Sequence, residues 1–131
     1  MSALNEIEAL IARYFDALYT CDTDLLQAVF HPRAIYATAD ESPLLYRTMD
    51  EYVPVVAARQ SPQSRGEARR DIIDGIDLAG ENTARARVRC SIGDKDFVDF
   101  LTFIRVEGRW QIISKIFQIL PRSHTSTSTE A

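Results

Sequence analysis

The chain has 131 residues, of which 46% are hydrophobic and 26% charged, and its formal net charge is −4. These values predict one globular domain whose core is large enough to need no disulfide or metal. The acidic balance argues against non-specific nucleic-acid binding, and no apolar run approaches the ~20 residues that span a bilayer. Because the N-terminal residues lack a signal-peptide pattern and Cys21 and Cys90 lie far apart, we expect a cytoplasmic protein with free thiols.

Helical periodicity dominates the first quarter of the chain. Apolar residues recur every three or four positions from about residue 3 to 20, which predicts a helix with one wide apolar face. Asp22 or Thr23 then caps a short second helix. That helix is expected to end at His31-Pro32, because a residue before proline avoids helical backbone angles.

A third helix is expected after two short strands. The strands are predicted at about 33–38 and 44–47. Thr48 and Glu51 have the spacing of a capping box, which opens a helix that runs to about residue 59. Pro54 lies past the first turn, so the helix is expected to be irregular there.

From residue 68 onward the apolar period changes to two, which is typical of strands. The predicted strands are 68–78, 83–92, 96–106 and 109–119, and short turn-forming segments separate them. Short turns imply antiparallel neighbours, and helices followed by such a meander are an α+β pattern. Residues 1–120 are therefore expected to form a single domain, and residues 121–131 a disordered C-terminal tail of low complexity.

Two charged residues, Asp99 and Lys115, lie inside the apolar strands of the last hairpin. A two-residue turn at Glu107-Gly108 would place Asp99 opposite Ile116, whereas a three-residue turn with a glycine bulge would place it opposite Lys115. Both registers of each strand are apolar, so which register faces the interior stays open. We interpret the two residues as a partly buried ion pair, with Lys115 as an anchor for a ligand carboxylate as the alternative.

Arg85, Arg87 and Arg89 alternate with small or apolar residues and therefore project from one face of a strand. Such a row indicates a solvated or dimer-interface face, and a basic wall for an anionic ligand is the alternative. The nearby acidic residues that could neutralise it are Asp71, Asp74, Asp77 and Glu81.

Three segments of the chain resemble the nuclear transport factor 2-like superfamily, which includes SnoaL-like cyclases, scytalone dehydratase and ketosteroid isomerase. Residues 11–22 are similar to its first helix, residues 25–34 to its second helix and first strand, and residues 98–117 to its terminal hairpin. The resemblance covers about residues 4–119. The residues that bring the chain closest to the group called putative lumazine-binding are Phe30, His31, Pro32, Asp99, Gly108, Trp110 and Lys115.

This resemblance implies a cone-shaped α+β barrel, in which N-terminal helices pack on a strongly curved, mainly antiparallel sheet. It also implies a homodimer through the outer face of the sheet and a mostly apolar cavity inside.

Three residues are candidates for catalysis. Tyr14 lies where ketosteroid isomerase carries the tyrosine of its oxyanion hole, but the positions of its general base and second donor fall on Thr38 and Thr102. Because threonine is no useful base, we do not expect steroid isomerisation. His31 with an aspartate such as Asp99 could run a dehydration, as the resemblance to scytalone dehydratase suggests, although capping of a helix end also explains this histidine.

Our leading hypothesis is that the protein binds a small hydrophobic or aromatic molecule in a conical pocket. The residues expected to bind it are Tyr14, Leu18, Phe30, Tyr36, Tyr52, Val56, Phe100, Thr102, Lys115 and Phe117. One alternative is a lyase or isomerase of the dehydratase or polyketide-cyclase type that uses Tyr14, His31 and Asp99. The other is a non-catalytic dimeric interaction domain with a filled cavity. No metal or cofactor is expected, because the sequence has no His pair, calcium loop, phosphate loop or dinucleotide fingerprint.

Overall fold

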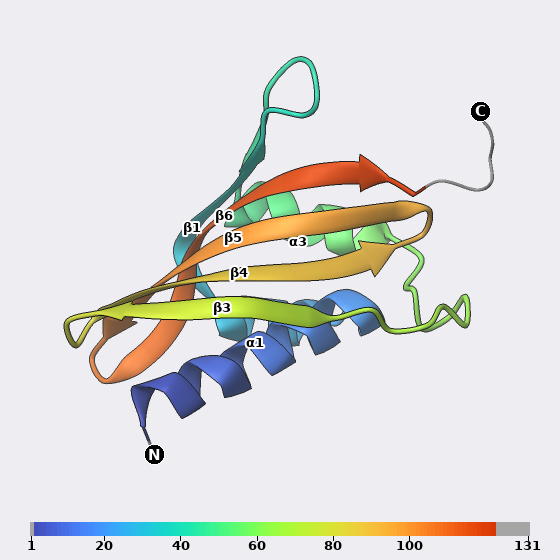
Figure 1. Ribbon diagram of the computed structural model, residues 1–131. Helices are drawn as coiled ribbons and strands as arrows, with labels where there is room; N and C mark the ends of the chain where they lie inside the picture. Colours follow the sequence, from blue (N-terminus) through green and yellow to red (C-terminus); the bar gives the residue numbers. More distant parts are fainter. Residues whose placement is uncertain (1, 123–131) are drawn as a thin grey trace.

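The computed structural model describes residues 2–122, in which three helices pack on one six-stranded sheet (Figure 1). The elements are α1 (Ala3–Thr20), α2 (Thr23–Val29), β1 (Phe30–Thr38), β2 (Leu45–Thr48), α3 (Met49–Ala58), β3 (Ile72–Ala79), β4 (Thr83–Ile92), β5 (Lys95–Val106) and β6 (Arg109–Pro121). None of the described helices is long and apolar enough to cross a membrane. Of the predicted tail, residues 123–131 lie outside the described residues, and Pro121 is the last residue of β6.

The helix starts follow local capping chemistry. Asp22 is the N-cap of α2, and its side chain accepts a hydrogen bond from the backbone N–H of Leu25 over 3.1 Å. At the start of α3 the predicted capping box is present, because the backbone N–H of Thr48 donates to the Glu51 carboxylate over 2.9 Å. The helix continues through Pro54 to Ala58.

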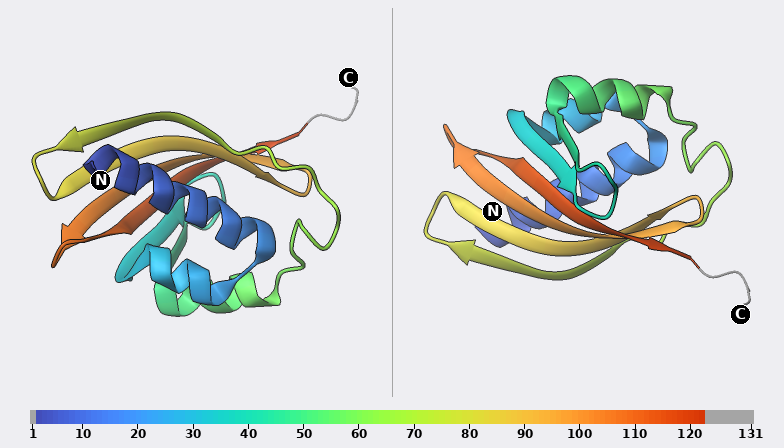
Figure 2. Two further views of the ribbon diagram at one scale, coloured as in Figure 1. Left: turned by 90° about the horizontal axis from the view of Figure 1, so that it is seen from below. Right: turned by 90° about the horizontal axis from the view of Figure 1, so that it is seen from above.

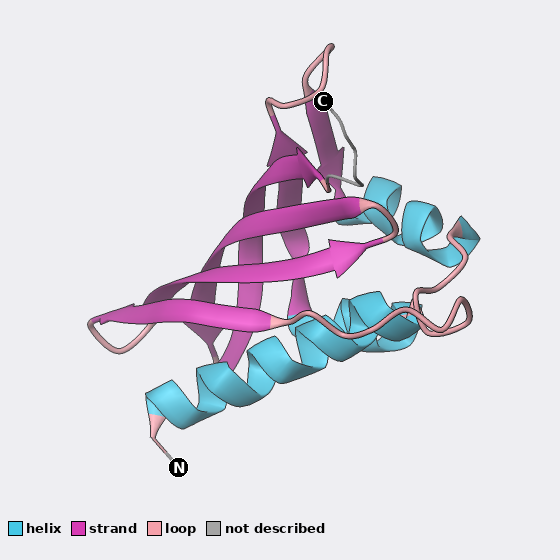
Figure 3. Cartoon of the chain, turned by 45° about the vertical axis from the view of Figure 1, so that its right-hand side comes forward, coloured by secondary structure: helices cyan, strands magenta, loops and turns pink. Residues whose placement is uncertain are grey.

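The strands form an open sheet in the order β2-β1-β6-β5-β4-β3. All neighbours are antiparallel except β1 and β6, which run parallel, so the sheet is mixed and its two edges do not meet. Figure 2 shows the sheet bending around α1, while α2 and α3 lie together beside β1. Figure 3 shows the same arrangement from the side, with all three helices on one face of the sheet. The fold is therefore the α+β architecture that the resemblance implies, built on an open, curved sheet.

Strand β3 begins four residues later than expected. The sequence predicts a strand from residue 68, but β3 starts at Ile72. The guanidinium of Arg69 instead pairs with Asp16 of α1 over 2.9 Å and with Asp71 over 2.7 Å. These contacts hold the segment before β3 against the first helix, so it does not extend the sheet edge.

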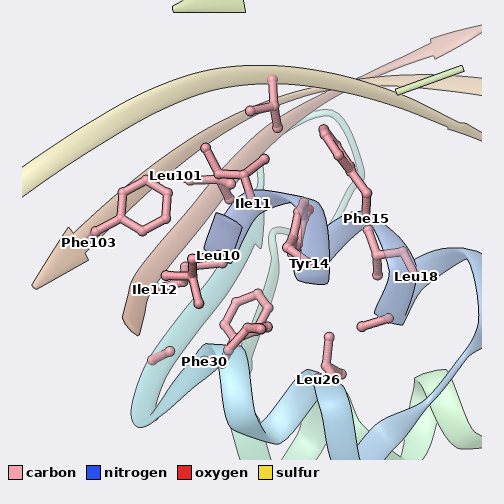
Figure 4. Packing of buried hydrophobic residues seen from close by; sticks show 14 of the residues in the cluster. Leu10, Ile11, Tyr14, Phe15, Leu18, Leu26, Phe30, Leu101, Phe103 and Ile112 are labelled. Atoms are coloured by element: carbon pink, nitrogen blue, oxygen red, sulfur yellow. The ribbon is translucent and has the colours of Figure 1, made fainter. Parts of the chain in front are cut away.

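The core lies between α1 and the face of the sheet that bends around it. Figure 4 shows Leu10 and Tyr14 of α1 on the side of the helix that faces Leu101 and Phe103 of β5. All four side chains are at most 2% exposed. Their burial follows from the helical period of α1 and the two-residue period of β5.

The terminal hairpin turns on two residues. Val106 pairs with Arg109, and Glu107 and Gly108 have φ angles of 52° and 77°. Two consecutive positive φ angles are typical of the turn whose twist matches an antiparallel hairpin. This is the first of the two predicted turns, but it does not lead to the register expected from it.

A bulge at Ile113 changes the register of the hairpin. The pairing shifts between Thr102 and Phe103, so that Leu101 lies opposite Lys115. Asp99 then lies opposite Phe117, and both predicted partners, Ile116 and Lys115, were wrong. The sequence reasoning placed any bulge at the turn, whereas the extra residue lies inside β6.

Candidate functional site

A buried polar cluster of four residues, Tyr14, Cys90, Asp99 and Lys115, lies between α1 and the sheet. Asp99 is 0% exposed, and its Oδ2 accepts a hydrogen bond from the Tyr14 hydroxyl over 2.5 Å. Lys115, 5% exposed, places Nζ 3.9 Å from the same oxygen. The Cys90 thiol lies 4.0 Å from it. The other three side chains therefore converge on one carboxylate oxygen of Asp99.

Strand alternation and the bulge together bring these side chains to one place. Cys90 and Asp99 belong to the inward-facing sets of β4 and β5, which alternate with exposed residues. Lys115 lies two residues before Phe117, the cross-strand partner of Asp99, so it is the diagonal neighbour of that carboxylate. Tyr14 reaches the same carboxylate from the buried face of α1.

Burial and the Asp99 charge set the protonation of the cluster. Burial raises the pKa of Tyr14 well above its ordinary value, and the nearby Asp99 charge raises it further. The same two causes raise the pKa of the Cys90 thiol. Burial alone would lower the pKa of Lys115, but the Asp99 carboxylate outweighs it and the pKa is raised. At neutral pH the cluster therefore holds a neutral phenol, a neutral thiol and a lysine cation.

One polar atom of the cluster has no partner. The second carboxylate oxygen of Asp99, Oδ1, is buried and accepts no hydrogen bond within residues 2–122. A buried acceptor without a donor costs free energy, so Oδ1 adds to the cost of burying this carboxylate.

An aromatic cage surrounds the Lys115 ammonium. Its Nζ lies 5.2 Å from the ring centres of Tyr14 and Tyr36, 5.3 Å from that of Phe117 and 5.8 Å from that of Tyr52. Tyr36 and Tyr52 also stack on each other, with ring centres 4.2 Å apart. Aromatic faces stabilise a cation that has lost its water, so the cage compensates part of the cost of burying the ammonium.

A small hollow borders this cage, and we call it the interior hollow. Its volume is about 20 Å³, and it is lined by Leu18, Tyr36, Tyr52, Arg59, Cys90, Ile92, Phe97, Lys115 and Phe117. Such a volume holds roughly one water molecule. The interior of the cone is thus almost completely filled by its own side chains.

A much larger depression, the outer groove, lies on the opposite face of the sheet. It encloses about 620 Å³ and is lined by Asp74, Gly75, Ile76, Asp77, Arg85, Ala86, Arg87, Phe100, Leu101 and Thr102. Phe100 and Thr102 alternate with the buried residues of β5 and therefore face away from the helices. These two residues, expected in one pocket with the others, lie apart from the cage.

The arginine row of β4 lies beside the outer groove and is paired. Arg85 contacts Asp77 over 2.9 Å, and Asp74 contacts Arg87 over 3.1 Å and Arg89 over 2.9 Å. The side chains are exposed, as expected for a solvated or interface face. The other two acids considered, Asp71 and Glu81, contact Arg69 and Arg105 instead.

The remaining predicted pocket residues belong to the interior. Leu18 lines the interior hollow. Phe30 packs between Tyr14 and Tyr52, with ring centres 5.9 and 6.0 Å away. Val56 of α3 is fully buried in the same core. The structure therefore brings eight of the ten predicted ligand-binding residues into one interior region and separates Phe100 and Thr102 from it.

His31 does not join the polar cluster. It lies near the start of β1, where its Nδ1 accepts a hydrogen bond from the backbone N–H of Arg33 over 3.0 Å. It is absent from the lining of the interior hollow. Within residues 2–122 no three His, Cys, Asp or Glu side chains are grouped so as to hold a metal ion.

Sequence reasoning did not select four residues that line the interior hollow, Arg59, Cys90, Ile92 and Phe97. Two of them carry a usable signal. Cys90 shares the period of the small residues opposite the arginine row, and Phe97 precedes Asp99 by two positions in β5. Arg59 carries none, because a charged residue at a helix end is ordinary.

Solved structures with the same fold include several NTF2-like proteins. One from Shewanella baltica, of unknown function, has a TM-score of 0.78 and 23% identity over 92% of this chain and 98% of that one. Another of unknown function, from Silicibacter pomeroyi, has a TM-score of 0.76 and 23% identity over 92% and 100%. A ketosteroid isomerase-like protein from Erwinia carotovora atroseptica has a TM-score of 0.70 and 14% identity over 89% and 95%. At these identities the likeness shows the fold alone.

A curated relative matches only part of the chain. The aldolase FrzH from Cladobotryum sp is 40% identical over 38 residues, which are 29% of this chain and 30% of the aldolase. The match thus spans less than a third of that enzyme.

A family profile covers nearly the whole described chain. Residues 2–118 match the family described as "Putative lumazine-binding". The fold is the one found in NTF2-like proteins. The chain therefore belongs to the family described as putative lumazine-binding.

Proposed function

We propose that the protein binds a small planar aromatic molecule at the interior hollow, against the aromatic cage of Lys115. The observation that carries the proposal is a buried lysine cation held by four rings beside this hollow. Well-packed apolar residues in place of a buried ion pair often give a protein the same stability or more. Stability alone therefore does not explain why Lys115 and Asp99 are buried here. The description of the family as lumazine-binding supports the same ligand class.

Binding at this place requires the cage to open. Ligand sites commonly enclose roughly 300–1,000 Å³, whereas the interior hollow has about 20 Å³. Tyr36 comes from β1 and Tyr52 from α3, so separating their stacked rings moves α3 away from the sheet. The proposed ligand then lies between these two rings.

Native mass spectrometry of freshly purified protein, followed by denaturation and analysis of released molecules, tests the proposal directly. We expect a stoichiometric adduct. If the protein is purified without ligand, we expect it to bind added lumazine saturably, as monitored by the fluorescence of lumazine. Tyr36→Leu should weaken lumazine binding at least about tenfold, because aromatic stacking is lost. Tyr46→Leu, which removes an exposed tyrosine of β2, is the matched control. Absence of both an adduct and saturable binding would refute the proposal and favour the interaction domain with a filled interior.

A lyase or isomerase is the second candidate, and one contact favours it. The Tyr14 hydroxyl and the Asp99 carboxylate are joined over 2.5 Å, which is the geometry of a proton donor and a base in one buried site. The partial match to an aldolase supports chemistry next to a carbonyl group. In this candidate Asp99 removes a proton and Tyr14 donates a hydrogen bond to the resulting oxyanion, while His31 takes no part.

Deuterium exchange into acetone, followed by NMR, tests this candidate without knowledge of the substrate. The wild-type protein should accelerate exchange at the carbon beside the carbonyl. Asp99→Asn should abolish the acceleration, and His31→Ala should retain it. Exchange that does not exceed the buffer rate would contradict the catalytic reading and leave the binding proposal unaffected.

We further propose that the protein forms a homodimer through the outer face of the sheet. Ile116 and Phe100 pair across the strands and are 45% and 54% exposed. Exposed apolar side chains that adjoin a large groove are typical of an interaction surface. Phe100→Asp should convert a dimer into a monomer in analytical ultracentrifugation, whereas Leu44→Asp, at an exposed position outside this face, should not. A monomeric wild-type protein would contradict this assembly.

A further inference from the structure

The interior hollow is lined by two cations and no carboxylate. Arg59 and Lys115 both border it, and none of its other lining residues is acidic. This contrasts with the chain as a whole, whose formal net charge is −4. The space beside the cage is therefore lined by basic side chains and by no acidic one, in a protein that is acidic as a whole.

The two cations differ in their pairing: Lys115 forms an ion pair with Asp99, which does not line the hollow, and Arg59 forms none within residues 2–122. Lys115 reaches its carboxylate, Asp99, at 3.9 Å, which is longer than a hydrogen bond. Arg59 follows α3, where its backbone N–H donates to the carbonyl of Val56 over 3.1 Å. No ion pair joins its guanidinium to a carboxylate within the described part of the chain.

The charge of Arg59 acts on the same groups that surround the hollow. Burial raises the pKa of Tyr52 and of Cys90, and the Arg59 charge acts in the opposite direction on both. Arg59 directly follows the last residue of α3, whereas Lys115 belongs to β6, and both line the interior hollow. The two cations thus face one small space from a helix and from the sheet.

We infer that the molecule bound here is an aromatic anion, whose ring stacks against Tyr36 and Tyr52 and whose charged oxygens lie between Arg59 and Lys115. This inference rests on the proposed function and adds the charge of the ligand to it. A carboxylate or an enolate has the required group, because a guanidinium donates two parallel hydrogen bonds to such oxygens. Asp99 has a supporting role, since it keeps Lys115 protonated without occupying the hollow.

Benzoate and benzamide test the inference, because they have nearly the same shape and differ in charge. Both are titrated into the full-length protein at pH 7 and followed by two-dimensional NMR, which also detects weak binding. We expect benzoate to bind at least about tenfold more tightly than benzamide, which corresponds to about 1.4 kcal/mol. Arg59→Gln should reduce this preference to about threefold or less. Arg13→Gln, which removes an exposed arginine of α1, should keep it.

Each result decides between the two proposals. Equal binding of benzoate and benzamide at the cage would overturn the anion inference and leave the aromatic pocket standing. Equal loss of the benzoate preference in Arg59→Gln and Arg13→Gln would also overturn it, because the preference would then come from the overall charge. Absence of binding by both probes and by lumazine would overturn the pocket itself. Since Arg59 is partly exposed and outside the core cluster, its variant is expected to fold.

Discussion

Replacement of Lys115 by methionine is expected to destabilise the protein strongly. Methionine has a similar length and fills the cage, so the change removes the charge and little packing. Asp99 then remains fully buried, with the Tyr14 hydroxyl as its one short contact. Removal of one partner from a buried ion pair costs about 3–5 kcal/mol, because the other charge is left uncompensated.

The double variant separates the charge effect from the packing effect. Asp99→Asn combined with Lys115→Met removes both charges and leaves a neutral amide beside the Tyr14 hydroxyl. We expect this protein to be more stable than either single variant, with a coupling free energy of about 2–3 kcal/mol. Lys95→Met, at the exposed start of β5, is the control and should change stability by less than about 0.5 kcal/mol.

Urea unfolding followed by circular dichroism measures these differences. A domain of this size has roughly 5–15 kcal/mol of stability, so a loss of the expected size is measurable without complete unfolding. If Lys115→Met lowers the free energy of unfolding by less than about 1 kcal/mol, Asp99 and Lys115 do not form a buried ion pair in solution. A double variant that is the least stable of the three would refute the reasoning equally.

The ion pair also predicts how stability depends on alkaline pH. The pKa of Lys115 is raised above its ordinary value of 10.5, because the Asp99 carboxylate outweighs the effect of burial. The folded state then binds the proton more tightly than the unfolded state, so the contribution of Lys115 is complete below pH 10.5 and is lost as the pH rises toward the folded-state pKa. Wild-type stability should therefore fall above that pH more steeply than the stability of the double variant.

Three further experiments each test one residue. Tyr14→Phe removes the hydroxyl that donates a hydrogen bond to the buried Asp99. It should lower the free energy of unfolding in urea by about 1–3 kcal/mol. An unchanged free energy of unfolding would mean that the hydroxyl does not bind the carboxylate. Gly108→Ala places a side chain on a residue with a φ angle of 77° and should lower the free energy of unfolding by about 1–2 kcal/mol. Gly75→Ala in β3 is the control and should not destabilise the protein, because this glycine has no positive φ and open space around its Cβ position. The Cys90 thiol should resist alkylation in the native protein, because burial and the Asp99 charge raise its pKa, and rapid labelling would contradict its position in the core.

The sequence predicts the fold well because its signals are local. The apolar period of α1, the capping chemistry of Asp22 and Glu51 and the turn at Glu107-Gly108 each depend on a few neighbouring residues. The start of β3 was harder to predict, because the contact of Arg69 with α1 joins residues 53 positions apart. Local patterns carry no information about such a contact.

The candidate site was predicted in part for the same reason. Tyr36, Tyr52 and Phe117 have the residue type and spacing of pocket residues and do gather around Lys115. Phe100 has the same residue type but lies in the outward register of β5. Because both registers of the hairpin are apolar, alternation alone could not separate the two faces.

The bulge in β6 explains the existence of the polar cluster. Ile112 faces the interior, and regular alternation from it would turn Ser114 and Ile116 inward and Lys115 outward. The extra residue, Ile113, shifts the alternation by one position, so that Lys115 and Phe117 face Asp99 and the cage instead. A lysine would be easy to place on the outer face, where water solvates it. The chain instead uses a bulge to bury this cation beside a hollow, an arrangement that a stable core does not require.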